Sequence, residues 1–171
     1  MTKPRLKKMT GQHHGFTLLE MMVVIAVIGI LALMAVPSFQ ELIVREQIVV
    51  AVPLADIAKT PIAASWALTQ TFPHDNTGAG LPAADKIVNN FVSALLVQDG
   101  VIHLTFGIRA HSTIIGKVLT IRPAVVEDAP VVPVTWVCAN AVGPDKMTVK
   151  GENKTTVPNQ YLPLGCRAPG Q

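Results

Sequence analysis

Charged and aromatic side chains are scarce in this chain. Of its 171 residues, 15% are charged and 5% are aromatic, with a single tyrosine, whereas 50% are hydrophobic. So apolar a sequence can bury enough surface to offset the entropy of ordering, which excludes intrinsic disorder. The 13 prolines and 12 glycines follow no period, which excludes a collagen-like fibre. The length suits one domain with one core rather than two.

Cysteine is rarer still, and its two copies, Cys138 and Cys166, lie near the C-terminus. They could be free thiols in a cytosolic protein, whereas in an exported domain a disulfide is the better interpretation. Whether the chain is exported therefore has to be settled first.

The first segment accounts for the net positive charge. Lys3, Arg5, Lys7 and Lys8 lie within the first fifteen residues, and no acid lies among them. The remaining chain has ten basic residues against eleven acidic ones. The net charge of +3 thus belongs to this segment and not to the domain, which makes a nucleic-acid-coating protein a poor interpretation.

A long apolar run follows the basic segment. From Phe16 to Phe39 there are 24 residues with one charge, Glu20. As a helix the run would measure about 36 Å, enough to cross a hydrocarbon core of about 30 Å. The basic segment would stay on the cytoplasmic side and the rest would be sent outward. An ordinary signal peptide or a signal anchor is the alternative. For a signal peptide, Ala35-Val36-Pro37-Ser38 fits a cleavage site poorly because of its proline.

The junction between the two segments indicates another kind of processing. The sequence Gly15-Phe16-Thr17-Leu18-Leu19-Glu20 resembles the prepilin motif of type IV pilins and the related pseudopilins. The resemblance implies that a prepilin peptidase cuts between Gly15 and Phe16 and N-methylates Phe16. Residues 1–15 would be a discarded leader, and residues 16–40 would be kept as the transmembrane and assembly half of a long helix.

Glu20 is an expensive residue in such a helix, because an intramembrane carboxylate must be paired or lie near an interface. After cleavage the nearby cation is the α-amino group of Phe16, four residues away on the same helix face. The resemblance implies that Glu20 of an incoming subunit pairs with this amine on its neighbour. A glutamate that snorkels to the headgroups is the alternative. Gly29 and Pro37 weaken the helix, and in filaments of the family the stretch between them can lose helical order.

The rest of the chain predicts an α+β fold. A capping box at Ser38–Glu41 would restart the helix after its kink at Pro37, and an apolar stripe carries it over residues 41–68, kinked at Pro53 and interrupted again at Pro61. Turn-forming residues mark 69–90 as a connecting loop. Four strands are expected within residues 91–138, at 91–97, 101–106, 117–122 and 131–138, with Gln98-Asp99-Gly100 as a hairpin turn. They would form an antiparallel sheet packed on the second half of the helix.

The C-terminal part carries a second resemblance. Trp136-Val137-Cys138, followed by Tyr161-Leu162-Pro163-Leu164-Gly165-Cys166-Arg167, looks like the ending of type IVa major pilins. The resemblance implies a disulfide between Cys138 and Cys166 that closes the loop 138–166. The ending favours a pilin over a pseudopilin. Tyr161 is the only tyrosine, which departs from the family, where several are common.

No group of residues indicates catalysis. His13 and His14 lie in the expected leader, and His74, His103 and His111 have no carboxylate or thiol at metal-ligand spacing. We therefore expect no enzyme, no metal site and no cofactor.

Three shorter patterns carry little weight. Gly78-Ala79-Gly80 lacks the lysine and the flanking elements of a phosphate loop. Glu127-Asp128 is expected to be a solvated turn between strands. Asn153-Lys154-Thr155 matches a glycosylation sequon, which is a pattern short enough to arise by chance.

The function expected from the resemblance is polymerisation into a type IV pilus, a fibre used for adhesion, twitching motility or DNA uptake. The partners would be other copies of the chain, the prepilin peptidase, and an inner-membrane assembly platform with assembly and retraction ATPases. The subunit would reside in the inner membrane of a Gram-negative bacterium and then in the extracellular fibre. The alternatives are a minor pilin, a type II secretion pseudopilin, or a competence DNA receptor.

The last alternative rests on a charge bias in the C-terminal loop. The loop has two acidic residues, Asp145 and Glu152. Against them stand four basic residues, which are Lys146, Lys150, Lys154 and the flanking Arg167. A weak contact with DNA, an anionic surface or a neighbouring subunit is one interpretation. A solvated loop edge is the plainer one, since no aromatic residue lies between the lysines to stack on bases.

Overall fold

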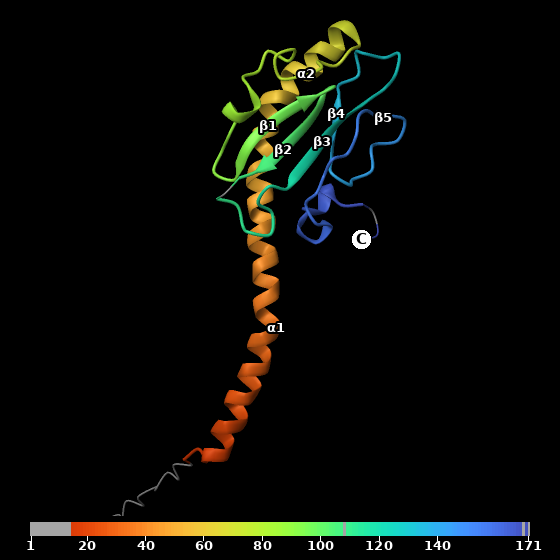
Figure 1. The fold of residues 1–171 in the computed structure, drawn as a ribbon. Helices are drawn as coiled ribbons and strands as arrows, with labels where there is room; N and C mark the ends of the chain where they lie inside the picture. Colours follow the sequence, from red (N-terminus) through yellow and green to blue (C-terminus); the bar gives the residue numbers. More distant parts are fainter. Residues whose placement is uncertain (1–14, 108, 169, 171) are drawn as a thin grey trace, which may run out of the picture. The chain divides into compact units, whose positions relative to one another are not determined.

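The computed structural model describes residues 15–107, 109–168 and 170 (Figure 1). The chain forms two compact units, Met1–Ser38 and Phe39–Gln171. Each unit is described by itself below.

Helix α1, Leu18–Ala51, begins in the first unit and ends in the second. Its start is capped by Thr17, whose Oγ1 accepts a hydrogen bond from the Glu20 backbone N–H at 3.2 Å. The helix restart predicted at Ser38 is wrong, because α1 runs through this position without a break. The side chains of residues 35–38 lie outside the described residues, so the kink at Pro37 stays a prediction.

Within the second unit the helix has one interruption. A 3₁₀ turn, η1 (Val52–Ala55), contains Pro53 and separates α1 from α2 (Asp56–Thr69). The break predicted at Pro53 is therefore confirmed. The one predicted at Pro61 is wrong, since Pro61 lies inside α2. Gln70 then ends α2 in a left-handed conformation, and its N–H donates to the Trp66 carbonyl at 2.9 Å.

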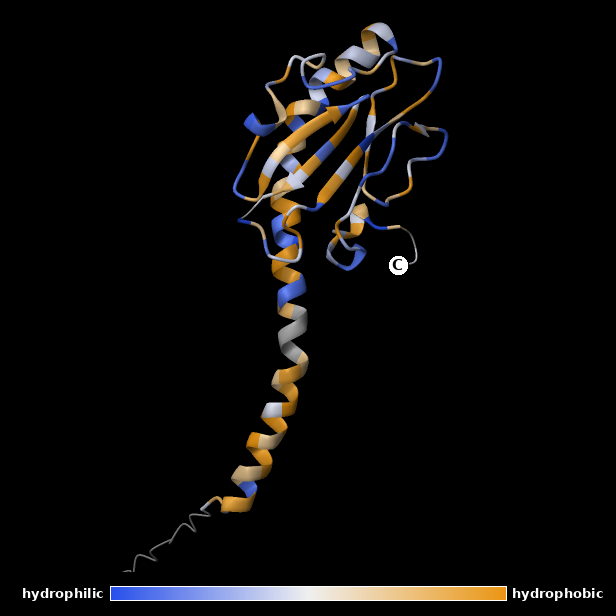
Figure 2. Cartoon of the chain, in the orientation of Figure 1, coloured by the Kyte–Doolittle hydropathy of each residue, from blue (hydrophilic) through white to orange (hydrophobic). Residues whose placement is uncertain are grey.

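The helical residues of the second unit bury one face. Its buried members are spaced three or four apart, as on one side of a helix: Val44, Ile48, Ala51, Ala55, Ala58, Ile62 and Trp66. This face belongs to the same core as the inner side chains of the sheet, among them Leu95, Ile102, Leu104, Phe106 and Leu119. The helix lies behind the sheet in Figure 1, and the strands are largely apolar in Figure 2.

The sheet is antiparallel throughout. Its strands lie side by side in chain order: β1 (Val92–Gln98), β2 (Val101–Phe106), β3 (Val118–Val125) and β4 (Thr135–Cys138). The predicted four-stranded sheet on a long helix is confirmed. A fifth short strand, β5 (Thr148–Val149), pairs with β3 and was not predicted from the sequence.

The hairpin between β1 and β2 has the predicted turn. Gln98 pairs with Val101, and Asp99 and Gly100 between them have φ angles of 49° and 79°. Positive φ at both positions is the requirement of a two-residue turn that matches the strand twist. The turn rests on the preceding loop, because the Gly100 N–H donates to the Pro73 carbonyl at 2.9 Å.

Two strands differ from their predicted bounds, and both differences lie next to prolines. β3 runs on through Pro123 to Val125 instead of ending at 122, and the Pro123 carbonyl accepts a hydrogen bond from the Lys150 N–H at 2.8 Å. β4 begins at Thr135 instead of 131. Pro130 and Pro133 lack an N–H, so the stretch before Thr135 cannot form a regular ladder. Three further 3₁₀ turns are η2 (Ala84–Lys86), η3 (Asn159–Tyr161) and η4 (Leu164–Cys166).

Candidate functional site

The first candidate site is the apolar start of α1. Every described side chain from Phe16 to Met34 is exposed, and its large apolar members expose between 41% and 79% of their surface. This helix is long and apolar enough to cross a membrane, and none of its most apolar stretch is buried against the described chain. So large an apolar surface calls for a cover of lipid or of other molecules.

The residues singled out by the sequence lie on this helix as expected from their spacing. Glu20 stands in the first turn, where its charge is favourable to the helix dipole. Its side chain is exposed, and it takes part in no ion pair between described residues. Gly29 is exposed too, and a Cβ added there would meet nothing within 4 Å in the described chain. Its lack of a side chain therefore serves no packing within one described chain.

Thr17 is a residue of this site that the sequence reasoning passed over. Its hydroxyl accepts from the Glu20 N–H and so satisfies one of the free donors at the helix start. The spacing Thr17-x-x-Glu20 is that of a capping box and could have revealed it. Phe16 directly precedes this cap, so the cap sets the helix start one residue after the predicted new N-terminus.

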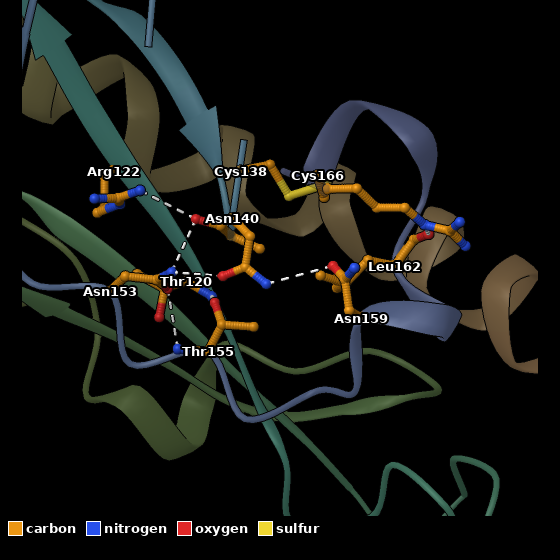
Figure 3. Close-up of a disulfide and its surroundings, with 11 residues drawn as sticks. Thr120, Arg122, Cys138, Asn140, Asn153, Thr155, Asn159, Leu162 and Cys166 are labelled. Atoms are coloured by element: carbon orange, nitrogen blue, oxygen red, sulfur yellow. Dashed lines mark hydrogen bonds between the residues drawn. A yellow bond between two sulfur atoms is a disulfide. The ribbon is translucent and has the colours of Figure 1, made fainter. Parts of the chain in front are cut away.

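The second candidate site is the region closed by the disulfide. Cys138, at the end of β4, is bonded to Cys166, at the end of η4, with an S–S distance of 2.08 Å (Figure 3). The predicted disulfide is confirmed. Next to it, the Asn140 N–H donates to the Cys166 carbonyl at 3.0 Å. The bond therefore fixes the last turn of the chain to the end of the sheet.

Within this region residues 150–157, here called the crossing segment, pass over the outer face of the sheet. Just before them β5 pairs with Ala124 and Val125, on the edge of β3 that β2 leaves free beyond Ile121. At the other end the Thr156 N–H donates to the Val118 carbonyl at 2.9 Å, on the opposite edge of β3. The segment thus covers β2 and β3 from outside, which explains why β2 is buried on both faces.

Asn153 fixes the middle of the crossing segment. Its Nδ2 donates to the Ala139 carbonyl at 3.0 Å and to Asn140 Oδ1 at 2.9 Å (Figure 3). Its Oδ1 accepts from the Thr155 N–H at 3.1 Å. The nitrogen that a glycan would occupy is therefore used in two hydrogen bonds, which argues against modification of this sequon in the folded chain.

The histidines are less isolated than their spacing suggested, and His74 is the clear correction. His74 Nδ1 lies 2.5 Å from Asp99 Oδ1, an acid 25 residues further along the chain. The hydrogen bond to Asp99 and its negative charge raise the pKa of His74 above its ordinary value. His111 is held through its backbone, whose N–H donates to Gln47 Oε1 at 2.8 Å.

His103 is buried under the crossing segment. Its Nδ1 lies 3.0 Å from Thr120 Oγ1, and only 5% of its surface is exposed. Burial lowers the pKa of His103, and the positive charge of Lys154 lowers it further. In the described part of the chain, no three His, Cys, Asp or Glu side chains are arranged to hold a metal ion.

The lysines of the closed loop have more acidic neighbours than the sequence suggested. Lys150 forms an ion pair with Glu127, which lies outside the loop. Lys154 Nζ donates to Gln98 Oε1 at 2.8 Å and lies 3.9 Å from Glu152 Oε2. Glu127 and Asp128 do form an exposed turn, as predicted. The pairing reduces the free positive charge on this surface.

Comparison with known proteins settles the family. A family model described as pilin (bacterial filament) matches residues 44–167, more than two thirds of the chain. The chain belongs to the pilin family. A second model, described as the prokaryotic N-terminal methylation motif, matches residues 11–36 of this pilin, which include Gly15, Phe16 and Glu20.

Curated relatives match this pilin along nearly its whole length. A type IV major pilin protein PilE of Neisseria gonorrhoeae is 32% identical, with 90% of this chain and 93% of the relative covered. A fimbrial protein of Neisseria meningitidis serogroup B is 29% identical, with 90% and 93% covered. The fimbrial protein EcpC of Eikenella corrodens is 30% identical, with 90% of each chain covered.

Proposed function

We propose that this pilin is the precursor of a structural subunit of a type IV pilus. The observation that carries the proposal is the match to type IV major pilins over 90% of the chain. It is joined by an exposed apolar helix at one end and a disulfide-closed region at the other. The role is structural and non-enzymatic, and the work of the chain is to polymerise with its own copies.

The exposed helix gives the reason why such a chain polymerises. Fully burying a large apolar side chain is worth about 1.5–3 kcal/mol, and the stretch Phe16–Met34 leaves all of its described side chains uncovered. Lipid covers them while the subunit waits in the inner membrane. In the fibre the helices of neighbouring copies take the place of lipid.

Processing and export need other proteins in this proposal. A prepilin peptidase cuts between Gly15 and Phe16 and methylates Phe16, and an assembly platform driven by ATPases extracts the subunit into the fibre. The orientation of the helix in the membrane follows from the basic leader, which stays in the cytoplasm. The fibre is then extracellular, in a Gram-negative cell.

The test is to examine surface fibres sheared from cells that make the chain and from a matched deletion strain. We expect fibres whose main component has Phe16 as its methylated first residue by mass spectrometry, and loss of these fibres in the deletion strain. Gly15→Val should leave the precursor uncut. Fibres that persist in the deletion strain, together with wild-type fibres in which the chain is only a trace component, would favour a minor pilin. A mature chain that begins near Ser38 would overturn the proposal.

The charge arrangement does not favour the DNA-receptor alternative. Lys150 and Lys154 have acidic neighbours, and Arg167 donates to backbone carbonyls. Lys146 is the loop lysine that takes part in no ion pair between described residues. Lys146 and Arg167, whose charges are unpaired among the described residues, give few of the phosphate contacts on which non-specific DNA binding depends.

A further inference from the structure

Two arginines from distant parts of the second unit converge on one backbone oxygen. Arg45 Nη2, on α1, donates to the Gln160 carbonyl at 3.1 Å, and Arg167 Nη2 donates to the same carbonyl at 2.7 Å. The two Nη2 atoms therefore lie within about 6 Å of each other, close enough for their charges to repel. Both side chains are half-buried.

This arginine pair, Arg45 and Arg167, has no acidic counterpart in the part of the chain that the structure describes. None of the ion pairs between described residues includes either arginine. Glu41 and Glu46 lie close to Arg45 along α1, but neither forms an ion pair with it. In addition, Arg45 Nε is buried and has no hydrogen-bond partner among described residues. Two adjacent guanidinium groups with most of their donors unused form a ready site for an anion.

The disulfide-closed region holds Arg167, one member of this pair, in place. Arg167 follows directly after Cys166, and its Nε donates to the Leu162 carbonyl at 2.8 Å. Gln160, whose carbonyl both arginines share, lies in η3 of the same closed region. The guanidinium of Arg167 is thus fixed at two points and needs little reordering to bind a ligand.

We propose that Arg45 and Arg167 bind the phosphate of a phospholipid headgroup while the apolar segment of α1 spans the bilayer. Planar guanidinium groups match phosphate oxygens in pairs of hydrogen bonds. This inference rests on the proposed function, because it requires the subunit to reside in a membrane before assembly.

The depth of Arg45 along the helix selects a headgroup as the ligand. The apolar run ends at Phe39, and Arg45 follows six residues later, about 9 Å further along a helix. Helical side chains lean back toward the helix N-terminus, and an arginine stem can extend along apolar surface in that direction. This brings the guanidinium back into the headgroup layer, which adds about 5–8 Å to each side of the hydrocarbon core.

The test uses the mature chain, residues 16–171, with its arginine guanidinium carbons labelled with carbon-13. It is reconstituted at high dilution into bilayers of phosphatidylethanolamine and phosphatidylglycerol. Solid-state NMR then measures how strongly lipid phosphorus-31 dephases the guanidinium signals. Arg45→Gln and Arg167→Gln should each remove about half of the dephasing, since each arginine supplies one contact, and the double variant should remove it. Arg109→Gln, which changes an exposed arginine elsewhere, should leave the dephasing unchanged.

Three results would overturn the proposal. The first is a wild-type chain whose guanidinium signals are not dephased by lipid phosphorus-31. The second is a double variant whose guanidinium signals are still dephased. The third is a guanidinium–carboxylate contact between copies in bilayers that lack the phosphate contact, which would assign the pair to a second copy. Cys138 and Cys166 should resist alkylation in every variant, which shows that the region stays folded.

The same samples separate this contact from the proposed function. Flotation with the vesicles measures insertion of α1, and it should be equal in the wild type and the double variant. Insertion without phosphate contact would overturn the arginine-pair proposal and leave the proposed function unaffected. A wild-type chain that fails to float with vesicles would count against both proposals.

Discussion

Thr120 is the polar residue on which the outer face of the sheet depends. It is fully buried, and its Oγ1 accepts from the Lys154 N–H at 3.1 Å and lies 3.0 Å from His103 Nδ1. Its own N–H donates to Thr155 Oγ1 at 3.1 Å. Side-chain oxygens here take the place of a regular strand ladder, so the crossing segment can be attached to the sheet at an angle. Without these bonds Thr120 would leave a buried polar group unpaired.

Burial of His103 should make stability depend on pH. Because its pKa in the folded chain is lowered below the ordinary 6.5, the unfolded chain binds the proton more readily. The stabilisation that neutral, buried His103 contributes is fully present above about pH 6.5. It is lost as the pH falls from there toward the lowered pKa. The denaturant midpoint of the mature chain in mild detergent should decrease as the pH is lowered from 7.5 to 5. His103→Gln should flatten this dependence on pH.

His74 provides the matched control for this measurement. Its pKa is raised by Asp99, so its contribution is present below 6.5 and is lost as the pH rises through the raised value. His74→Gln should therefore leave the decline at low pH in place. An unchanged decline in His103→Gln would show that other groups cause it.

Asn153 gives a second prediction at this scale. Asn153→Asp turns a donor that serves two oxygens into a carboxylate that faces them, which should cost about 2–3 kcal/mol of unfolding free energy. Asn90→Asp, at an exposed position, should cost little, and the two unfolding curves give the comparison. Mass spectrometry of the mature chain should also find no glycan on Asn153. Equal stability of the two variants would show that the hydrogen bonds of Asn153 are replaceable.

The hairpin of β1 and β2 shows how one element is fixed by another. Its turn carries Gly100, and a Cβ built there would lie 2.5 Å from Phe72 Cγ. The ring of Phe72 in turn stacks on Trp66 of α2, with ring centres 4.8 Å apart. The hairpin tip, the loop and the end of α2 therefore form one packed group.

This packing predicts a difference between two glycines of similar conformation. Gly100→Ala should lose about 1–2 kcal/mol for its left-handed backbone and a further 1–3 kcal/mol or so for the clash with Phe72. Gly80 has a φ of 68° and open space around its Cβ position, so Gly80→Ala should lose the first part alone. Denaturant unfolding of both variants measures the gap. If both lose the same amount, the contact with Phe72 does not limit the turn.

The disulfide is the device that holds the irregular C-terminal region as one element. It joins residues 28 apart, and on the chain-entropy model such a closure is worth about 3–4 kcal/mol. Replacing both cysteines by serine should lower the unfolding free energy by about this amount and loosen the crossing segment first. Hydrogen exchange of the amides of residues 150–157 checks the second part. Unaltered protection there would show that Asn153 and Thr120 suffice to hold it.

At the scale of the whole molecule, the features predicted correctly were those with a local signal. The helix, its break at Pro53, the hairpin turn and the cysteine pair each follow from residues close in sequence or from a family motif. The features missed depend on partners far apart in the chain. β5 pairs with β3, the crossing segment contacts Thr120 from 34 residues away, and Asp99 meets His74 across a loop. Only the folded sheet brings these groups together, so no spacing rule could find them.

The two units separate folding from assembly, and Glu20 tests that separation. It lies on the exposed helix of the first unit, whereas the core and the disulfide belong to the second. Glu20→Ala removes an intramembrane charge, so insertion should be as good or slightly better. The stability of the second unit should not change, because Glu20 is exposed and all of the core residues belong to the second unit.

What Glu20→Ala should lose is the fibre. The charged α-amino group of Phe16 on the neighbouring copy would then lie in the apolar fibre core without its partner, at a cost of several kcal/mol. We therefore expect normal amounts of cut, membrane-held subunit and few or no fibres, with the ratio of sheared fibre to total subunit as the readout. Glu20→Gln should fail in the same way, since the amide keeps the size without the charge. Wild-type amounts of fibre from either variant would show that the carboxylate is dispensable, and the apolar helix alone would then have to set the stagger between copies.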